Sequence, residues 1–408
     1  MVAAVVSDES SGASAWTARA AAIVGLCFAI NMADGIDVTI LSFIAPRLQD
    51  EWGIGPDTMG NLFSAGLIGM AIGGMFLAPL ADRFGRRRLI LVALALMSTG
   101  MVASGFVSTV VQLFGLRVIV GSGIGTVLAT MAALAAETAP PSGRNFAVGM
   151  VQAGYPFAAV FTGLIVANLL PVYGWAAMLI GAGVVTVALF PLAWALLPRT
   201  APQSAERQAG SIRVSALFAA DYRWRTVALW GAVFFGLMVL YFIVSWIPKL
   251  AIQAGLSETN GIYAGALYNF GAFCGTTAMA LLSTRLPLRQ IVPTMLLSAV
   301  AAMMVFASVS MGVAATLAVA FVIGVTLQGG YNGVWPLAAG AYPPDRRATG
   351  VGWAIGIGRS GAILGPMIGG YLMAAEASLP LLFGAYCVPL VLCALCAALV
   401  ERGRVAGN

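Results

Sequence analysis

Four charged side chains stand within long apolar stretches of the chain: Asp34, Asp37, Arg117 and Arg359. The two aspartates lie three positions apart in "AINMADGIDVTILSF", residues 29–43. If this stretch crosses a bilayer, a charge there costs on the order of 2.5 to 3.5 kcal/mol on insertion scales, so it must be paired, protonated or in contact with water. Carboxylates at this depth can bind protons, and guanidinium groups can bind anions.

The composition indicates that these stretches do cross a bilayer. The chain has 408 residues, of which 60% are hydrophobic and 9% are charged, and its mean hydropathy is +0.95. Soluble proteins carry about 25% charged residues, so the sequence is that of an integral membrane protein. Its five cysteines all lie in apolar runs. We interpret them as small packing residues rather than disulfide partners or metal ligands.

Apolar runs of spanning length, about 20 residues each, recur along the chain with polar breaks between them. Each run must be helical, because lipid offers no hydrogen-bonding partner to backbone amides and an open sheet edge cannot exist there. The predicted fold is therefore an all-α membrane protein with twelve transmembrane helices. Their predicted ranges are 19–45, 58–80, 89–108, 110–137, 145–170, 175–197, 226–247, 260–283, 290–310, 313–340, 349–374 and 379–400.

A long polar interruption at residues 197–225 divides these helices into two six-helix bundles. We expect it to be a cytoplasmic linker with a short amphipathic helix at about 211–222 on the membrane surface. The polar breaks "DRFGRRRLI" and "STRLPLRQI" occupy corresponding places in the two halves, and paired halves of this kind hold a binding site at the midplane between them. The predicted divisions are an N-terminal tail (1–18), the first bundle (19–197), the linker (198–225), the second bundle (226–400) and a C-terminal tail (401–408).

The basic residues in the polar breaks predict the orientation. Nearly all of them, including the cluster at residues 86–88, fall on the side shared with both chain ends, whereas Arg47 and Lys249 fall on the other side. The positive-inside rule then places both termini in the cytoplasm of a multi-pass protein of the cell (inner) membrane. This bias also explains the net charge of +6, so nucleic acid is not an expected partner. The first fifteen residues, which contain Asp8 and Glu9, are expected to be an uncleaved tail rather than a signal peptide.

The predicted depths bring Asp37 and Arg117 to one level. Asp37 lies about eight residues before the outer end of its helix and Arg117 about seven residues after the outer start of its own, so each is roughly 10–12 Å deep at 1.5 Å per residue. Asp34 shares a helix face with Asp37. We therefore expect the first helix to present two carboxylates to Arg117. A purely structural ion pair is the alternative.

Arg359 lies near the centre of the eleventh predicted helix, and the second half of the chain has no acidic residue at matching depth. The planar fork of a guanidinium suits a carboxylate, which can accept two parallel hydrogen bonds from it. Arg359 therefore predicts an anionic substrate. The alternative is that its side chain reaches the membrane surface or binds backbone carbonyls.

Aromatic and amide side chains recur at helical spacing in other predicted helices, mainly those at 260–283 and 313–340. A set of this kind could line a cavity, stack against an aromatic ring and bind hydroxyl groups. Helix packing would explain any one of these residues equally well. The candidates are Tyr155, Tyr268, Asn269, Gln328, Tyr331, Asn332 and Trp335.

Glu137 ends the fourth predicted helix on the cytoplasmic side. We expect it to pair with a basic residue in an inner gate, unless it is simply a solvated helix end. Its candidate partners are Arg86, Arg87 and Arg144.

The chain resembles the major facilitator superfamily over essentially its whole length. The string "GGMFLAPLADRFGRRRLIL", residues 73–91, is similar to the superfamily's signature in the loop between the second and third helices. The resemblance implies a cytoplasmic gate whose side chains lock the helix ends in one state. These side chains are Asp82, Arg83, Arg86 and Arg87.

Three further strings resemble the aromatic acid:H⁺ symporter family: "DGID", "RVIVGSGIGTVLATMAALAAETAP" and "YPPDRRATGVGWAIGIGRSGAILGPMIGG". Members of that family carry benzoate-, hydroxybenzoate- or phenylpropionate-like acids. The resemblance implies that Asp34, Asp37, Arg117 and Arg359 are the functional positions. The chain departs from its relatives at "TMAALAAET" and in its short outer loops, which leaves open a larger lignin-derived acid or a non-aromatic carboxylate.

The predicted function is proton-coupled import of an organic anion, most simply an aromatic carboxylate, by alternating access. The chain has no histidine, so the coupling proton must bind a carboxylate. Asp34 and Asp37 are the candidates for proton coupling, and Arg117 and Arg359 for substrate binding. We expect a monomer in the lipid bilayer with no cofactor other than protons. A proton-driven antiporter that exports drugs or organic acids is the main alternative. A channel or a membrane enzyme is a further one, and the enzyme would need a nucleophile with a partner base.

Overall fold

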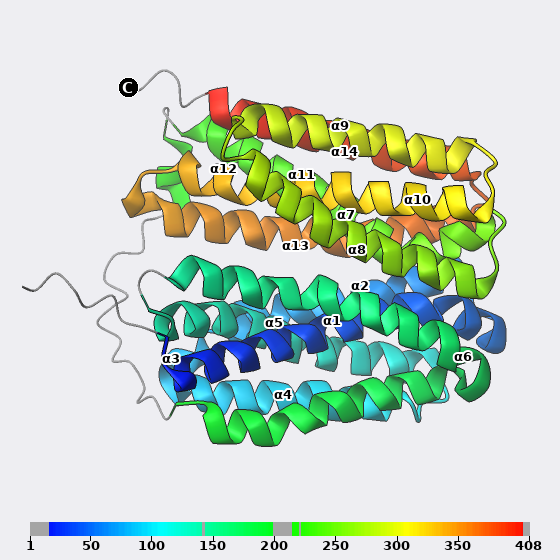
Figure 1. Ribbon diagram of the computed structural model, residues 1–408, viewed down its shortest axis with the longest axis horizontal. Coiled ribbons are helices and arrows are strands. Elements are labelled where there is room, and N and C mark those ends of the chain that lie inside the picture. Colours follow the sequence, from blue (N-terminus) through cyan, green and yellow to red (C-terminus); the bar gives the residue numbers. More distant parts are fainter. Residues whose placement is uncertain (1–15, 141–142, 199–213, 220–221, 403–408) are drawn as a thin grey trace, which may run out of the picture.

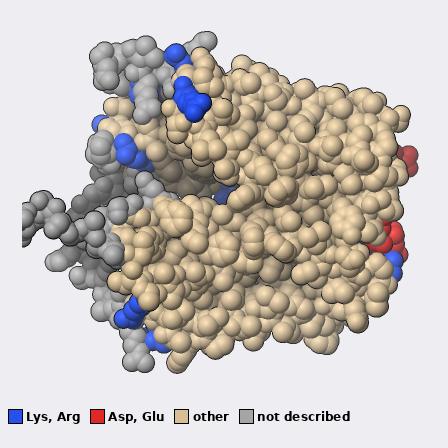
Figure 2. Space-filling view, in the orientation of Figure 1, with Lys and Arg blue, Asp and Glu red and all other residues tan. Residues whose placement is uncertain are grey.

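A computed structural model describes residues 16–140, 143–198, 214–219 and 222–402. All regular secondary structure in these ranges is helical. The helices form two bundles that lie side by side, the first in the lower half of Figure 1 and the second in the upper half. The described chain begins and ends at the left end of that view. We call this the basic end, because arginines gather there (Figure 2).

The first bundle holds six membrane-spanning segments. Its second segment passes into a π-helical turn, and Gly174, with φ +73°, divides its longest helix into two. The predicted break between residues 170 and 175 is therefore correct. The elements are α1 (Ala18–Trp52), α2 (Pro56–Ile72), η1 (Gly73–Leu77), α3 (Leu80–Phe84), α4 (Arg86–Ser104), α5 (Val110–Thr138) and α6 (Arg144–Leu196).

The second bundle also holds six segments, and its fourth is built from several short elements in sequence. The elements are η4 (Val214–Phe218), α7 (Arg223–Gln253), α8 (Glu258–Leu282), α9 (Leu288–Ser308), α10 (Val313–Ile323), η5 (Gly324–Gln328), α11 (Gly329–Asn332), α12 (Val334–Ala341), α13 (Pro344–Ala374) and α14 (Leu379–Arg402).

Ten helices in the described ranges are long and apolar enough to cross a membrane. One of them, α6, spans twice because it is divided at Gly174. The helix α8 is also long enough, but Glu258, Asn260 and Asn269 make it more polar. With these two additions the ten become the twelve predicted spans.

Several segments differ from the prediction. The helix α7 was predicted to end at residue 247 but continues to Gln253, and α13 begins at Pro344 rather than at residue 349. The first helix was predicted to end at residue 45 but continues to Trp52, because Pro46 is tolerated within it and Gly53 ends it in a left-handed conformation with φ 60°. In the linker, a short 3-10 helix at Val214–Phe218 stands where an amphipathic helix was expected at 211–222. Residues 199–213 and 220–221 of the linker lie outside the described ranges.

The two bundles pack tightly at the end opposite the basic end, which we call the closed end. Ser42 Oγ of α1 donates a hydrogen bond to Ser245 O of α7 over 2.7 Å, and Ser64 Oγ of α2 donates to Ile363 O of α13 over 2.7 Å. At Gly370 of α13 an added Cβ would lie 2.4 Å from Pro56 O. Figure 2 shows a surface hollowed between the bundles at the basic end and continuous at the closed end.

Candidate functional site

An ion pair in the interior joins Asp37 of α1 to Arg117 of α5. Arg117 Nη1 donates to Asp37 Oδ1 over 2.7 Å, and the side chains are 2% and 6% exposed, respectively. Arg117 Nη2 also donates to Ser104 Oγ of α4 over 3.4 Å. The ion pair expected from matching depth is therefore present. Because it is shielded from water, removing either partner would leave an uncompensated buried charge.

Asp34 lies one turn before Asp37 but does not join that ion pair. It is 5% exposed, and its Oδ1 atom has no hydrogen-bond partner among the described residues. Its charged neighbours are Asp37 and, on the other bundle, Arg359. The expectation that one guanidinium holds both carboxylates is therefore wrong. Residues three apart point about 60° apart around a helix axis, which is enough for one to face α5 and the other to face the second bundle.

Arg359 extends from α13 into the space between the bundles and is half-buried. Its guanidinium lies next to the hydroxyl of Tyr241 on α7. Among the described residues, none of the ion pairs within 4 Å includes Arg359. A guanidinium has five N–H donors, so this arrangement leaves donors that a carboxylate ligand can use.

The helices α1 and α6 approach each other closely beside the two aspartates. A Cβ atom at Gly35 would lie 2.4 Å from Tyr155 O, and Asn31 Oδ1 accepts a hydrogen bond from Tyr155 N over 2.9 Å. These contacts hold the half-buried Tyr155 next to Asp34. Only glycine fits at position 35 of "DGID", because a side chain there would separate the two helices.

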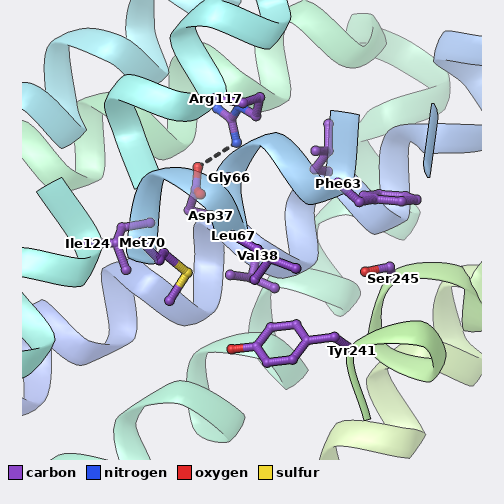
Figure 3. Close-up of a pocket in the computed structure, with 11 residues that line it drawn as sticks. Asp37, Val38, Phe63, Gly66, Leu67, Met70, Arg117, Ile124, Tyr241 and Ser245 are labelled. Atoms are coloured by element: carbon purple, nitrogen blue, oxygen red, sulfur yellow. Dashed lines mark hydrogen bonds and ion pairs between the residues drawn. The ribbon is translucent and has the colours of Figure 1, made fainter. Parts of the chain in front are cut away.

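A small cavity of about 30 Å³ lies beside the Asp37–Arg117 pair, between α1, α2, α5 and α7. Figure 3 shows the ion pair on one side of it and Tyr241 across from the pair. Most of the remaining wall is apolar. It is formed by Val38, Leu41, Phe63, Gly66, Leu67, Met70, Ile124 and Ser245.

The structure brings four of the predicted aromatic residues to this charged group. Tyr268 of α8 and Tyr331 of α11 are buried, and their hydroxyl groups have no hydrogen-bond partner in the described part of the protein. Tyr268 is an electrostatic neighbour of Tyr155, and Tyr331 of Arg359. Trp335 contacts Tyr331 edge to face, with ring centroids 5.9 Å apart. These side chains could surround an aromatic ring and bind its polar substituents.

The three predicted amides have other partners. Asn269 Nδ2 donates to Gly265 O of its own helix over 2.9 Å. Gln328 donates to Asn332, and Asn332 Nδ2 donates to Thr276 Oγ1 over 2.7 Å. The latter two amides thus connect α8 to the α10–α12 segment within the second bundle. Helix packing, the alternative noted for these residues, accounts for the contacts that they make.

The predicted gate residues lie at the basic end of the first bundle. Arg86 of α4 forms an ion pair with Glu137 of α5, which is one of the three predicted pairings. Arg87 lies over the ring of Trp194 on α6, 5.2 Å from its centroid. Arg83 lies over the ring of Phe84, 5.5 Å from its centroid. Arg144 is exposed at the start of α6, and the side chain of Asp82 lies outside the described part of the structure.

Reasoning from the sequence missed three residues that the structure places beside the charges: Asn31, Ser104 and Tyr241. Asn31 stands one turn before Asp34 in the same unusual stretch, so its spacing could have indicated it. Ser104 ends α4 and meets Arg117 only through the packing of α4 on α5. Tyr241 is one aromatic residue in a long apolar run, and its local sequence does not distinguish it from residues that only pack against neighbouring helices.

Comparison with known proteins identifies the family to which the chain belongs. The family model of the Major Facilitator Superfamily matches residues 27–339. The gallate transporter of Pseudomonas putida is 32% identical, over 94% of this chain and 91% of its own. The 4-hydroxybenzoate transporter PcaK of Pseudomonas aeruginosa is 32% identical over 86% of both chains. The benzoate transport protein of Acinetobacter baylyi is 27% identical, over 94% of this chain and 90% of its own.

Solved structures share the fold. A bacterial homologue of the human lysosomal transporter Spinster, solved in an inward-facing and unoccupied conformation, has a TM-score of 0.75 and 18% identity, with 96% of this chain and 98% of that chain covered. A D-xylose-proton symporter has a TM-score of 0.74 and 16% identity, with 92% and 96% covered. The protein is therefore a membrane transporter rather than an enzyme: it belongs to the major facilitator superfamily and is related to bacterial transporters of aromatic acids.

Proposed function

We propose that this protein imports an aromatic carboxylate together with protons, by alternating access between the two sides of the membrane. Relatives that transport gallate, 4-hydroxybenzoate and benzoate support this substrate class. Tyr331 beside Arg359, and Trp335 packed against Tyr331, support it independently, because they offer stacking surfaces and a hydroxyl group near a cation.

The observation that carries the proposal is the distribution of charge between the bundles. Asp37 is paired with Arg117, whereas Asp34 has an oxygen without a partner. Arg359 stands opposite with no carboxylate within ion-pair distance among the described residues. A site with one unpaired anion and one unpaired cation favours binding a proton and an organic anion together, because each charge is then compensated in the interior.

In the proposed cycle, water reaches the site from one side of the membrane and a proton binds Asp34. The substrate carboxylate binds Arg359 through the guanidinium fork. With both charges compensated, the bundles can close around the loaded site without burying an unpaired ion, and they reopen on the other side. Asp37 remains a candidate for proton coupling, and Arg117 remains a candidate for substrate binding. Their ion pair fixes the position of α1, which carries Asp34.

We infer that the basic end faces the cytoplasm, in agreement with the positive-inside rule. The conformation described here is then inward-facing, with the outer end packed and the inner end hollow (Figure 2). In the alternate conformation the basic end must close. The side chains proposed for that gate are Asp82, Arg83, Arg86, Arg87, Glu137 and Arg144.

Transport into proteoliposomes tests the proposal. Purified protein is reconstituted, and uptake of radiolabelled 4-hydroxybenzoate, gallate and benzoate is measured with the lumen alkaline relative to the outside. We expect saturable accumulation that a protonophore abolishes. Acid-driven export of the same compounds would support the antiporter instead. Uptake that follows only the substrate gradient and does not saturate would support a channel.

The variant Asp34→Asn separates coupling from binding. It keeps the size of the side chain but cannot release a proton, so accumulation driven by the proton gradient should be lost. Exchange of labelled for unlabelled substrate needs no net proton movement and should continue. Uphill uptake by Asp34→Asn at the wild-type level would remove Asp34 from the coupling site.

A further inference from the structure

Tyr241 lies between the two parts of the divided charge site. Across the cavity in Figure 3 it faces the Asp37–Arg117 pair of the first bundle. Its hydroxyl lies next to the guanidinium of Arg359 of the second bundle, and Asp34 is its other charged neighbour. The roles proposed above for the Asp37–Arg117 pair and for the other aromatic side chains give no role to Tyr241.

Helix packing fixes where Tyr241 can point. On one side, Ser42 of α1 donates hydrogen bonds to Val244 O over 2.9 Å and to Ser245 O over 2.7 Å, one turn beyond Tyr241 on α7. On the other side, α13 lies so close that a Cβ at Gly361 would be 2.2 Å from Phe234 O, and one at Gly365 would be 2.2 Å from Met238 O. The backbone of α7 is thus held against both α1, which carries the aspartates, and α13, which carries Arg359.

The side chain itself remains half-buried although its helix is packed on several sides, as expected for a residue that borders a cavity. The titratable and charged side chains around it are Asp34, Asp37, Arg117, Tyr155, Tyr331 and Arg359. A tyrosine hydroxyl can accept one hydrogen bond and donate another at the same time. When Arg359 donates to this hydroxyl, the hydroxyl proton is available to an acceptor.

We infer that Tyr241 positions Arg359 for the substrate carboxylate and transmits the protonation state of Asp34 to it. While Asp34 is ionised, it competes with a carboxylate ligand for the Tyr241 hydroxyl and the Arg359 guanidinium. Once Asp34 is protonated, both donors are released, and the substrate carboxylate accepts from the guanidinium and from the hydroxyl together. This inference rests on the proposed function, and it adds a positioning residue that makes anion affinity depend on the proton.

The variant Tyr241→Phe tests the inference, because it removes the hydroxyl and keeps the ring. KM and maximal rate are measured for proton-driven uptake of 4-hydroxybenzoate, at several external pH values. We expect KM to rise by about tenfold or more at low pH, as for loss of one hydrogen bond to a charged group. The maximal rate of uptake should change little, and the dependence of KM on pH should become weaker. Tyr173→Phe, which changes a tyrosine that is 64% exposed, is the control and should match the wild type.

Either of two results would overturn the inference. A wild-type KM and pH profile in Tyr241→Phe would show that the hydroxyl does not act on Arg359. A parallel fall in maximal rate and thermal stability, with an unchanged pH profile of KM, would show that Tyr241 serves packing alone. Failure of the proposed function is distinguishable, because in that case the wild-type protein itself would not accumulate the acid.

Discussion

Asp37 and Arg117 depend on each other at the level of single residues. Their side chains are 6% and 2% exposed and 2.7 Å apart, so removing one charge leaves the other buried without compensation. We expect Asp37→Asn to lower the free energy of unfolding by about 3 to 5 kcal/mol, the range for breaking a buried ion pair. Thermal unfolding of purified protein in detergent measures this change.

The matched control is Asp34→Asn, because Asp34 is on the same helix and similarly buried but has no ion-pair partner within 4 Å in the described structure. Its stability should stay within about 1 kcal/mol of the wild type, a change typical of residues without a special contact. The double replacement Asp37→Leu with Arg117→Met should be more stable than Asp37→Asn alone, because no unpaired charge is left. Equal destabilisation by Asp37→Asn and Asp34→Asn would contradict the unequal roles assigned here.

Arg359 is expected to act through the shape of its guanidinium as well as through its charge. Arg359→Lys keeps the positive charge but loses the planar fork. One charge-assisted hydrogen bond is worth about 1.5–3 kcal/mol, so the affinity for an aromatic carboxylate should fall by about tenfold to a hundredfold. Isothermal titration of purified protein with 4-hydroxybenzoate measures this loss. Unchanged affinity in Arg359→Lys would remove Arg359 from the binding site.

At the scale of helices, close packing of α2 and α5 determines where Arg117 stands. A Cβ at Gly121 would lie 2.0 Å from Gly66 O, and one at Gly125 would lie 2.0 Å from Met70 O. Both contacts are with backbone atoms, which cannot turn aside as a flexible side chain could. Small residues at such crossings allow membrane helices to approach closely, and here they bring Arg117 within reach of α1.

Gly121→Ala should therefore destabilise the protein, while Gly115→Ala on the same helix should not. Nothing lies within 4 Å of a Cβ at Gly115, so this substitution also controls for the effect of alanine on helix propensity. Overpacking of a well-filled contact costs about 1–3 kcal/mol. Thermal unfolding of the two variants, measured in parallel, gives the difference. Equal midpoints would mean that α2 and α5 can separate without penalty.

The helices could be predicted from sequence to within a few residues at most of their ends, because lipid imposes both their length and their apolar composition. The apolar run ends before Arg47, so the predicted end of α1 at residue 45 is too early. In the structure the residues that follow continue the helix, and Arg47 there pairs with Glu51 and with Glu258 of the second bundle.

The site could be predicted only in part. Charged residues within apolar helices are conspicuous in a sequence, so the sequence alone indicates Asp34, Asp37, Arg117 and Arg359 as candidates. Which of these charged side chains contact one another depends on the rotation of each helix about its axis. Apolar periodicity sets that rotation only when one face is polar, and α7 is apolar along nearly its whole length. The direction in which Tyr241 points therefore could not be predicted.

At the scale of the whole molecule, the contacts between bundles concentrate at the closed end. The ring of Trp246 on α7 packs edge to face against Phe63 of α2 in the first bundle, 5.0 Å between centroids. Within the second bundle, Trp246 Nε1 donates to Pro366 O of α13 and so holds the ring in this position. Arg47 and Glu258 add an ion pair between α1 and α8, 3.7 Å apart and partly exposed. Exposed pairs contribute about 0 to 1 kcal/mol, so the buried aromatic and glycine contacts must hold this end together.

Alternating access requires these contacts to separate in every cycle, and a cross-link can test that requirement. Asn61 Nδ2 of α2 and Tyr371 Oη of α13 lie 3.4 Å apart across the bundle interface. Cysteines introduced at both positions should be joined by a short thiol-specific cross-linker, because this structure already holds the two side chains together. Since the joined bundles cannot open at the closed end, uptake should fall to background, while substrate binding from the basic end should remain. Each single-cysteine variant, treated with the same reagent, should transport normally. If the doubly substituted protein is cross-linked and still transports at the full rate, the two bundles do not separate at this end, and the substrate must take another route.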